Sequence, residues 1–108
     1  MFKSYKYFLA SVGKAHFSIY KILYLFMEDK TWIVYILNCS DGTYYVGCTN
    51  SLADRFMRHS KGQVISTKQR LPVEIWTYIV FNNKYKAFNF EKYLKSGSGR
   101  AFLNKRLI

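Results

Sequence analysis

Residues 33–47 read IVYILNCSDGTYYVG, and this stretch decides the fold. Its β-branched and aromatic residues predict two strands, and the Ser-Asp-Gly sequence at 40–42 predicts the turn that joins them into a hairpin. A two-residue Asp-Gly turn would place Tyr35 and Tyr45 on opposite faces of the hairpin. A three-residue turn, with Gly42 in the left-handed conformation, would place both tyrosines on one face.

We favour the three-residue turn because it gives the hairpin one apolar face. In that register Tyr45 lies opposite Leu37, and Tyr35 lies opposite Gly47. The other face collects the apolar residues Val34, Ile36, Val46 and Cys48. Because glycine has no side chain, Gly47 is expected to leave an open space beside the Tyr35 ring. The sequence therefore predicts a core on one face and two tyrosines beside a gap on the other.

A helix is expected directly after the hairpin. Ser51, with Asp54 three residues later, resembles a capping box, and Gly62 provides the stop. Leu52 and Phe56 form the apolar stripe of this helix. The polar residues at the edge of the stripe are Arg55 and His59, one turn apart, and those that point to solvent are Arg58 and Lys61.

The rest of the chain predicts one strand and two more helices. The strand is expected over Val73–Asn82, and a helix over Lys84–Ser96 ends at Gly97. Ser98 is expected to cap a short final helix over 99–106. The buried residues of the longer helix are predicted to be Ala87, Phe90 and Leu94. This order predicts an α+β domain with a small three-stranded antiparallel or mixed sheet flanked by helices.

The composition indicates one domain with a strongly positive surface. The chain has 108 residues, half of them hydrophobic, and 17 basic against 6 acidic residues. Residues 31–108 hold twelve basic and four acidic residues, a net charge of +8, which is typical of proteins that bind nucleic acid or an anionic membrane. Cys39 and Cys48 lack the spacing of a zinc site or a disulfide framework, so we expect a reducing, cytoplasmic location.

Residues 1–30 form an N-terminal extension with two open interpretations. One is an amphipathic helix, because apolar residues alternate at spacings of three and four, with one histidine among them: Leu9, Val12, His16, Ile19, Leu23 and Phe26. The other, which we favour, is that Met27 is the natural start of the protein, just before the first strand. Lys14 and Lys21 interrupt the roughly 20 apolar residues that a membrane-spanning helix needs, and no clean signal-peptide cleavage site follows. We assign this extension no role.

Five residues are candidates for chemistry: Tyr35, Tyr45, Arg55, His59 and Glu91. Each has an ordinary explanation alone; Glu91, for example, forms an i, i+4 surface pair with Lys95. Together, their order resembles the GIY-YIG endonuclease superfamily. The first signature is present as Ile33-Val34-Tyr35, with isoleucine in place of the glycine, and the second as Tyr45-Val46-Gly47.

The resemblance covers essentially all of residues 31–108. Arg55 follows Tyr45 by ten residues, His59 follows Arg55 by four, and Glu91 lies on the helix after the third strand. The run FEKYLKSGSGRAF at 90–102 is similar to the small single-domain bacterial members, which are related to the N-terminal module of the excision-repair nuclease. Relatives often carry an asparagine after the glutamate, but the register does not fix whether Asn104 corresponds to it.

The resemblance implies a hydrolase that cleaves DNA phosphodiester bonds with one divalent metal, Mg²⁺ or alternatively Mn²⁺. Glu91 would hold the metal, since Mg²⁺ needs few protein oxygens. Arg55 would bind a phosphate oxygen, and Tyr45 would act as general base. Tyr35 would orient the water or the phosphate, and His59 would relay a proton or hold Tyr45. The open space beside Gly47 would leave room for the phosphate. The basic residues expected to contact nucleic acid are Arg58, Lys61, Lys95 and Arg100.

The family pattern and the positive charge favour DNA as the partner, in repair or recombination, with RNA as an alternative and no membrane expected. A non-catalytic nucleic-acid-binding module that keeps the basic surface is the main competing hypothesis. A peripheral membrane protein that uses the basic N-terminal extension is a second one. The sequence does not indicate the preferred DNA structure or the oligomeric state.

Overall fold

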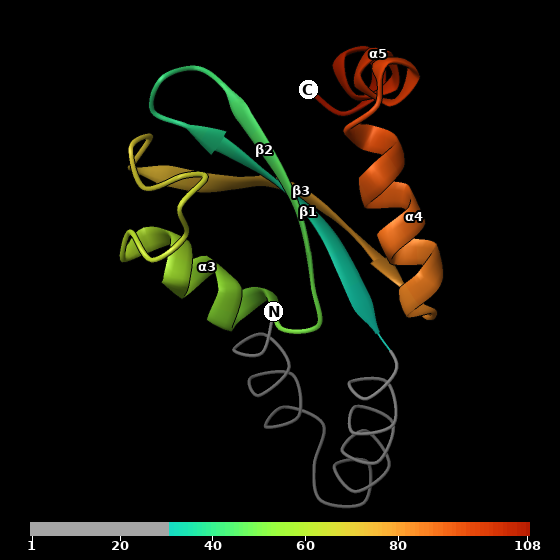
Figure 1. Ribbon diagram of the computed structural model, residues 1–108, viewed down its shortest axis with the longest axis horizontal. Helices are drawn as coiled ribbons and strands as arrows, with labels where there is room; N and C mark the ends of the chain where they lie inside the picture. Colours follow the sequence, from blue (N-terminus) through green and yellow to red (C-terminus); the bar gives the residue numbers. More distant parts are fainter. Residues whose placement is uncertain (1–30) are drawn as a thin grey trace, which may run out of the picture.

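The computed structural model describes residues 31–108, which form a three-stranded sheet with helices on both faces (Figure 1). The elements are β1 (Trp32–Cys39), β2 (Tyr44–Thr49), α3 (Leu52–Ser60), β3 (Val73–Phe81), α4 (Lys84–Leu94) and α5 (Gly97–Arg106). This is the α+β architecture predicted from the sequence. Both expectations for residues 1–30 lie outside the described residues. Within residues 31–108, no helix has the length and apolar character needed to cross a membrane.

The hairpin has the predicted three-residue turn. The amide of Gly42 donates to the carbonyl of Cys39 at 3.0 Å, and the amide of Cys39 donates to the carbonyl of Thr43 at 2.9 Å. Gly42 has a φ of +83°, in the left-handed region that glycine adopts without strain. As a result, Tyr35 pairs with Gly47, and Leu37 pairs with Tyr45.

The sheet is antiparallel throughout, with β1 in the centre between β2 and β3. Its predicted apolar face packs against α4 and α5, and the buried residues there are Val34, Ile36, Val46, Ala87, Leu94 and Leu103. Cys48 packs against this cluster, and Cys39 is buried; both are free thiols. Full burial of Cys39 and partial burial of Cys48 explain why cysteine serves there as a small apolar side chain.

The face that carries the tyrosines is also covered. Ile33, Tyr35 and Leu37 of β1 form a second buried cluster with Leu52 of α3, and Tyr35 is only 1% exposed. Ile33 occupies the position of the missing glycine of the first signature, and its side chain contributes to this cluster. A strand buried on both faces explains why residues 33–37 read as a continuous apolar run.

Two helix starts differ from the prediction. Ser51 precedes α3 but makes no side-chain capping bond; instead, the hydroxyl of Thr49 accepts from the amide of Ser51 at 3.0 Å. The last helix begins at Gly97 rather than Gly99, because Ser96 rather than Ser98 provides the cap. The Ser96 hydroxyl accepts from the amide of Gly99 at 3.2 Å.

The end of α3 follows the prediction, whereas α4 ends at Leu94 rather than at the predicted Ser96, and Gly97 begins the next helix instead of stopping this one. Gly62, with a φ of +73°, directly follows the C-cap of α3. On α4, Ala87 and Leu94 are buried, whereas Phe90 is only half-buried and packs against the edge of the core. The position of Phe90 therefore corrects the prediction that it fills the interior.

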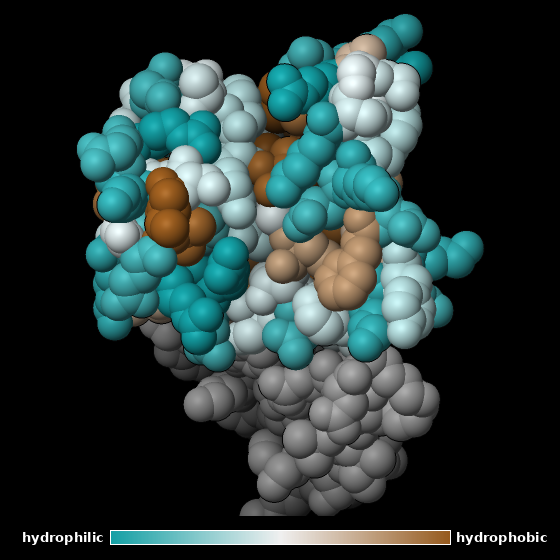
Figure 2. All heavy atoms as spheres, in the orientation of Figure 1, coloured by the Kyte–Doolittle hydropathy of each residue, from teal (hydrophilic) through white to brown (hydrophobic). Residues whose placement is uncertain are grey.

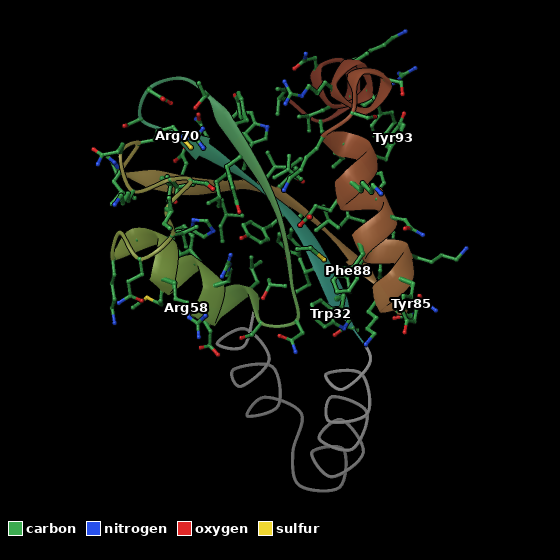
Figure 3. All side chains as sticks on the ribbon, in the orientation of Figure 1. Trp32, Arg58, Arg70, Tyr85, Phe88 and Tyr93 are labelled. Carbon is green, nitrogen blue, oxygen red and sulfur yellow. The ribbon has the colours of Figure 1, made fainter. Side chains whose placement is uncertain are left out.

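The segment 61–72 connects α3 to β3 and is tied to the hairpin turn. Arg70, labelled near the turn in Figure 3, donates to the hydroxyl of Thr43 at 2.7 Å and to the carbonyl of Ser66 at 3.1 Å. The Ser40 amide donates to the carbonyl of Arg70 at 3.1 Å. These bonds fix the segment over the end of the sheet, and Thr67 within it is completely buried.

Candidate active site

Tyr35 is the centre of the candidate site. Its hydroxyl lies 2.8 Å from Nε2 of His59, and the Nε–H of Arg55 donates to it at 3.4 Å. Arg55 and His59 are one turn apart on α3, so the helix presents both to the same strand residue. The structure therefore brings three of the five predicted site residues into direct contact.

Gly47 does not leave the open space predicted beside Tyr35. A Cβ atom added at Gly47 would overlap the hydroxyl end of the Tyr35 ring and would lie 2.7 Å from its Cε1 atom. The ring itself occupies the space that was expected for a phosphate. The glycine is needed because the tyrosine packs flat against the backbone of the neighbouring strand.

His59 is completely buried and is held at both ring nitrogens. Nδ1 lies 2.7 Å from the hydroxyl of Thr67, opposite the contact of Nε2 with Tyr35. The ring also meets that of Tyr45 edge-on, with centroids 5.0 Å apart. Burial, followed by the nearby Arg55 cation, lowers the pKa of His59 from 6.5 to about 4. His59 is therefore a neutral imidazole at neutral pH.

The environment keeps both Tyr35 and Arg55 in their protonated forms. Burial raises the pKa of Tyr35 from 10.0 to about 12, although its hydrogen bond with Arg55 acts in the opposite direction. The same hydrogen bond is the main cause that raises the pKa of Arg55 above its ordinary value. At neutral pH the cluster thus holds a phenol, a neutral imidazole and a guanidinium.

Tyr45 joins the cluster from the edge strand β2. It is half-buried, and its ring centroid lies 6.2 Å from that of Tyr35. Tyr45 is therefore the more exposed tyrosine of the pair. His59 was expected to relay a proton or hold Tyr45; the structure gives it an edge-on ring contact with Tyr45 and a hydrogen bond to Tyr35 instead.

Glu91 approaches the cluster around the edge of the sheet. Helix α4 packs on the face opposite to α3, but Lys95 at its end places Nζ 5.8 Å from the centre of the Tyr45 ring. Oε1 of Glu91 lies 3.6 Å from that Nζ atom. Burial is the main cause that raises the pKa values of Cys48 and Tyr35, and the Glu91 charge adds to it for both groups. Glu91 is therefore connected to Tyr45 through Lys95.

A groove of about 440 Å³ lies between β2 and the helices α4 and α5. Its apolar floor is visible as the brown hollow between these elements in Figure 2. The residues that line it are Tyr44, Tyr45, Val46, Leu94, Lys95, Arg100, Leu103, Asn104 and Ile108. Asn104 thus shares a groove with Tyr45 and lies near the Glu91 pair.

The four predicted nucleic-acid contacts lie on two sides of Tyr45. Arg58 and Lys61 are exposed on α3 and at its C-cap, where Figure 3 labels Arg58. Lys95 and Arg100 line the groove on the side of α4 and α5. This arrangement places positive charge on both flanks of the cluster, where a phosphate backbone that crosses it would run.

The described residues fit one type of metal site and exclude another. Within residues 31–108, no three His, Cys, Asp or Glu side chains gather in a group that could hold a metal. This excludes a site built entirely from protein ligands, such as structural zinc, in this part of the chain. A single partly exposed carboxylate such as Glu91 fits Mg²⁺, which keeps several waters and shares the substrate phosphate.

Thr67 is a site residue that sequence reasoning missed. It follows His59 by eight residues, outside any helix or strand, and neither spacing nor motif indicates it. The one available signal was indirect: a histidine on the buried stripe of α3 needs a polar partner for its second nitrogen.

Comparisons with known proteins identify the family of the chain. Residues 31–106 match the family model of the GIY-YIG catalytic domain. The chain is 37% identical over 71 residues to the UPF0213 protein of Bacillus pumilus, a match that covers 65% of this chain and 72% of the relative. It is 36% identical over 76 residues to a UPF0213 protein of Streptococcus pyogenes, covering 69% and 83%.

Among solved structures, the solution NMR structure of a UPF0213 protein from Bacillus halodurans matches with 29% identity and a TM-score of 0.45, covering 69% of this chain and 83% of that one. The family model covers most of the described domain and includes every candidate site residue. The chain belongs to the GIY-YIG catalytic domain family.

Proposed function

We propose that this protein is an endonuclease that hydrolyses phosphodiester bonds of DNA with a divalent metal, Mg²⁺ or Mn²⁺. The observation that carries the proposal is the contact cluster of Tyr35, Arg55, His59 and Tyr45 at the edge strand, flanked by basic side chains. Membership of the GIY-YIG family supports a nuclease and hence a nucleic-acid substrate.

Arg55 is the residue suited to bind the phosphate. Its guanidinium is only partly buried, and Nε is engaged by Tyr35, which orients the remaining N–H groups. A planar fork of donors fits a phosphate oxygen better than a lysine does. Because charge on these oxygens grows in the transition state, a preorganised cation there lowers the barrier.

Tyr45 is the residue suited to accept a proton from the attacking water. It is more exposed than Tyr35, and both Arg55 and the Lys95 cation lie near it. Tyr35, held as a phenol, orients the phosphate or the water beside it.

Glu91 is the residue that would hold the metal. When bound, Mg²⁺ would neutralise part of the phosphate charge and stabilise the leaving oxygen. The Glu91 carboxylate pairs with Lys95 at 3.6 Å, a separation that leaves it available for a second cation.

The ion pair between Glu91 and Lys95 also fits the competing function, a nucleic-acid-binding module without catalysis. If Glu91 only balances Lys95, the domain is a non-catalytic nucleic-acid-binding module with the same basic surface. The test is cleavage of plain, nicked and branched DNA, and of RNA, with and without Mg²⁺. Metal-dependent cleavage of DNA supports the proposal, and binding without cleavage of any substrate supports the binding module. A preference for branched or nicked DNA would place the enzyme in repair or recombination.

A further inference from the structure

The side chains of His59 and Thr67 form a buried hydrogen-bonded pair. Their few partners limit which atom can donate the proton in each hydrogen bond. Both residues are 0% exposed. His59 Nδ1 is the only hydrogen-bond partner that the Thr67 hydroxyl has among residues 31–108. On the other side of the ring, Nε2 faces the hydroxyl of Tyr35, which also accepts from Arg55.

Two arrangements of the protons satisfy these distances. In the first, His59 carries its proton on Nδ1 and donates to Thr67, and Tyr35 donates to Nε2. In the second, Thr67 donates to Nδ1, and His59 carries its proton on Nε2 and donates to Tyr35. A neutral imidazole has one N–H, so the two arrangements exclude each other.

The arrangements differ in which hydroxyl proton is left without an acceptor. In the first it belongs to Thr67, which is fully enclosed, and an unpaired buried donor costs about 1–3 kcal/mol. In the second it belongs to Tyr35, which is only 1% exposed but whose hydroxyl contacts the partly exposed Arg55. An oxygen that binds beside Arg55 would lie next to this proton, whereas the Thr67 hydroxyl contacts only the fully buried His59 among residues 31–108.

We propose that Thr67 is a positioning residue that fixes His59 in the Nε2–H tautomer, so that Tyr35 is presented as a hydrogen-bond donor. Both acceptor positions of the Tyr35 oxygen are then filled, by His59 and Arg55. Its own proton points to an acceptor in the site, which is a phosphate oxygen of the substrate if the proposed function is correct. The tautomer itself does not depend on the proposed function.

The segment around Thr67 is built to hold this position. Its amide donates to the carbonyl of Val64 at 3.1 Å, and its carbonyl accepts from the amide of Arg70 at 2.8 Å. Arg70 and Ser40 in turn tie the segment to the hairpin turn through the bonds described above. The Thr67 hydroxyl is therefore fixed relative to the same sheet that carries Tyr35.

The tautomer can be measured by NMR on the full chain through long-range couplings between ring protons and ¹⁵N nuclei. The chain has two histidines, and the His59 signals are identified by their loss in a His59→Gln variant. We expect wild-type Nε2 to show the shift of a protonated nitrogen and Nδ1 that of an acceptor. The reverse pattern would overturn the proposal.

Two variants test whether Thr67 sets the tautomer. Thr67→Ser keeps the hydroxyl and should keep the single Nε2–H tautomer. Thr67→Val has nearly the same shape without the hydroxyl, and it should give a mixture of tautomers. If the valine variant kept the wild-type pattern, Thr67 would have only a packing role, and the proposal would fail. Should the valine variant not fold, the wild-type spectrum still decides between the two arrangements.

Cleavage measurements separate this inference from the proposed function. If the wild-type protein cuts DNA, Thr67→Val should reduce the rate by at least tenfold, and Thr67→Ser should restore it. If wild type shows no nuclease activity but has the Nε2–H tautomer, the proposed function fails while the role of Thr67 stands. Equal rates for the valine variant and wild type would overturn the part of the inference that concerns the substrate.

Discussion

The ammonium group of Lys95 lies 5.8 Å from the centre of the Tyr45 ring, although the Tyr45 side chain and the helix that ends at Lys95 lie on different faces of the sheet. Tyr45 lies on the face that α3 covers, and Lys95 ends the helix that covers the other face. They meet because β2 is an edge strand and long side chains can reach around it. Because Lys95 also pairs with Glu91 at 3.6 Å, this contact connects Glu91 to the tyrosine cluster.

Replacement of Glu91 by glutamine tests the metal assignment. Loss of the pair with Lys95 should cost only about 0.2–0.5 kcal/mol of stability. Loss of the metal ligand should slow cleavage by orders of magnitude, since about 1.4 kcal/mol is a tenfold change in rate. DNA binding should survive because removing an anion does not weaken phosphate attraction. Cleavage rates, a binding titration and chemical denaturation measure the three effects.

The matched control for this change is Glu74→Gln. Glu74 is an exposed carboxylate on β3 that accepts a hydrogen bond from Asn38 at 3.1 Å. The Glu74→Gln variant should bind and cut DNA as wild type does. Wild-type cleavage by the Glu91 variant would make Glu91 an ordinary partner of Lys95.

Replacement of Gly47 by alanine tests the packing of Tyr35. The added Cβ would overlap the Tyr35 hydroxyl end, and overpacking of this kind costs typically about 1–3 kcal/mol. Because the displaced atom is the one that contacts His59 and Arg55, cleavage should fall as well. Urea denaturation and cleavage rates together check both effects.

Gly97→Ala is the control for this substitution. A Cβ at Gly97 meets nothing within 4 Å, and the residue lies at the start of α5. The Gly97→Ala variant should be as stable as wild type or slightly more stable. Equal stability of the Gly47 variant and wild type would mean that Tyr35 has room to move, which contradicts the observed contact.

The sequence predicted the hairpin because local chemistry determines it. A Ser-Asp-Gly turn with Gly42 at positive φ fixes the register, and the register fixes which tyrosines share a face. The buried stripe of α3 follows from periodicity in the same way. These features depend on residues close in sequence.

The features that the sequence did not predict depend on distant residues. The space beside Gly47 looked empty in the strand pairing, but the Tyr35 ring fills it once α3 covers that face. The partner of His59 came from the connecting segment, where no periodicity indicates Thr67. Likewise Ser96 and Ser98 are both cap-forming residues, and the structure uses Ser96.

The salt dependence of DNA binding tests the basic flanks. Affinity should fall steeply with added salt, because each Lys or Arg that contacts a phosphate releases condensed counterions. Arg58→Gln should weaken binding to all sequences and reduce the slope of log affinity against log salt by about 1. Lys84→Gln is the control, since Lys84 lies at the other end of α4 from Lys95, and its slope should match wild type. A flat salt dependence would show that phosphate contacts do not dominate.

The buried His59 should make the protein less stable in mild acid. Its pKa is lowered from 6.5 to about 4 in the folded state, so between these values the unfolded chain binds a proton that the folded one does not. The free energy of unfolding should therefore fall as the pH decreases from 6.5 to about 4. Above pH 6.5, the titration of His59 should change it little. From pH 7 to pH 5 the expected loss is on the order of 2 kcal/mol.

The measurement is the free energy of unfolding by urea at pH 7 and pH 5, for wild type and His59→Gln. Glutamine does not titrate, so the difference between the two pH dependences isolates His59. Carboxylates such as Asp41, whose pKa is lowered by its hydrogen bonds with Thr43, are present in both proteins and cancel. We expect the wild type to lose more stability than the variant over this interval. Equal losses would mean that the imidazole is protonated in the fold at no cost, and the neutral ring that links Tyr35 to Thr67 would then be the wrong description of the site.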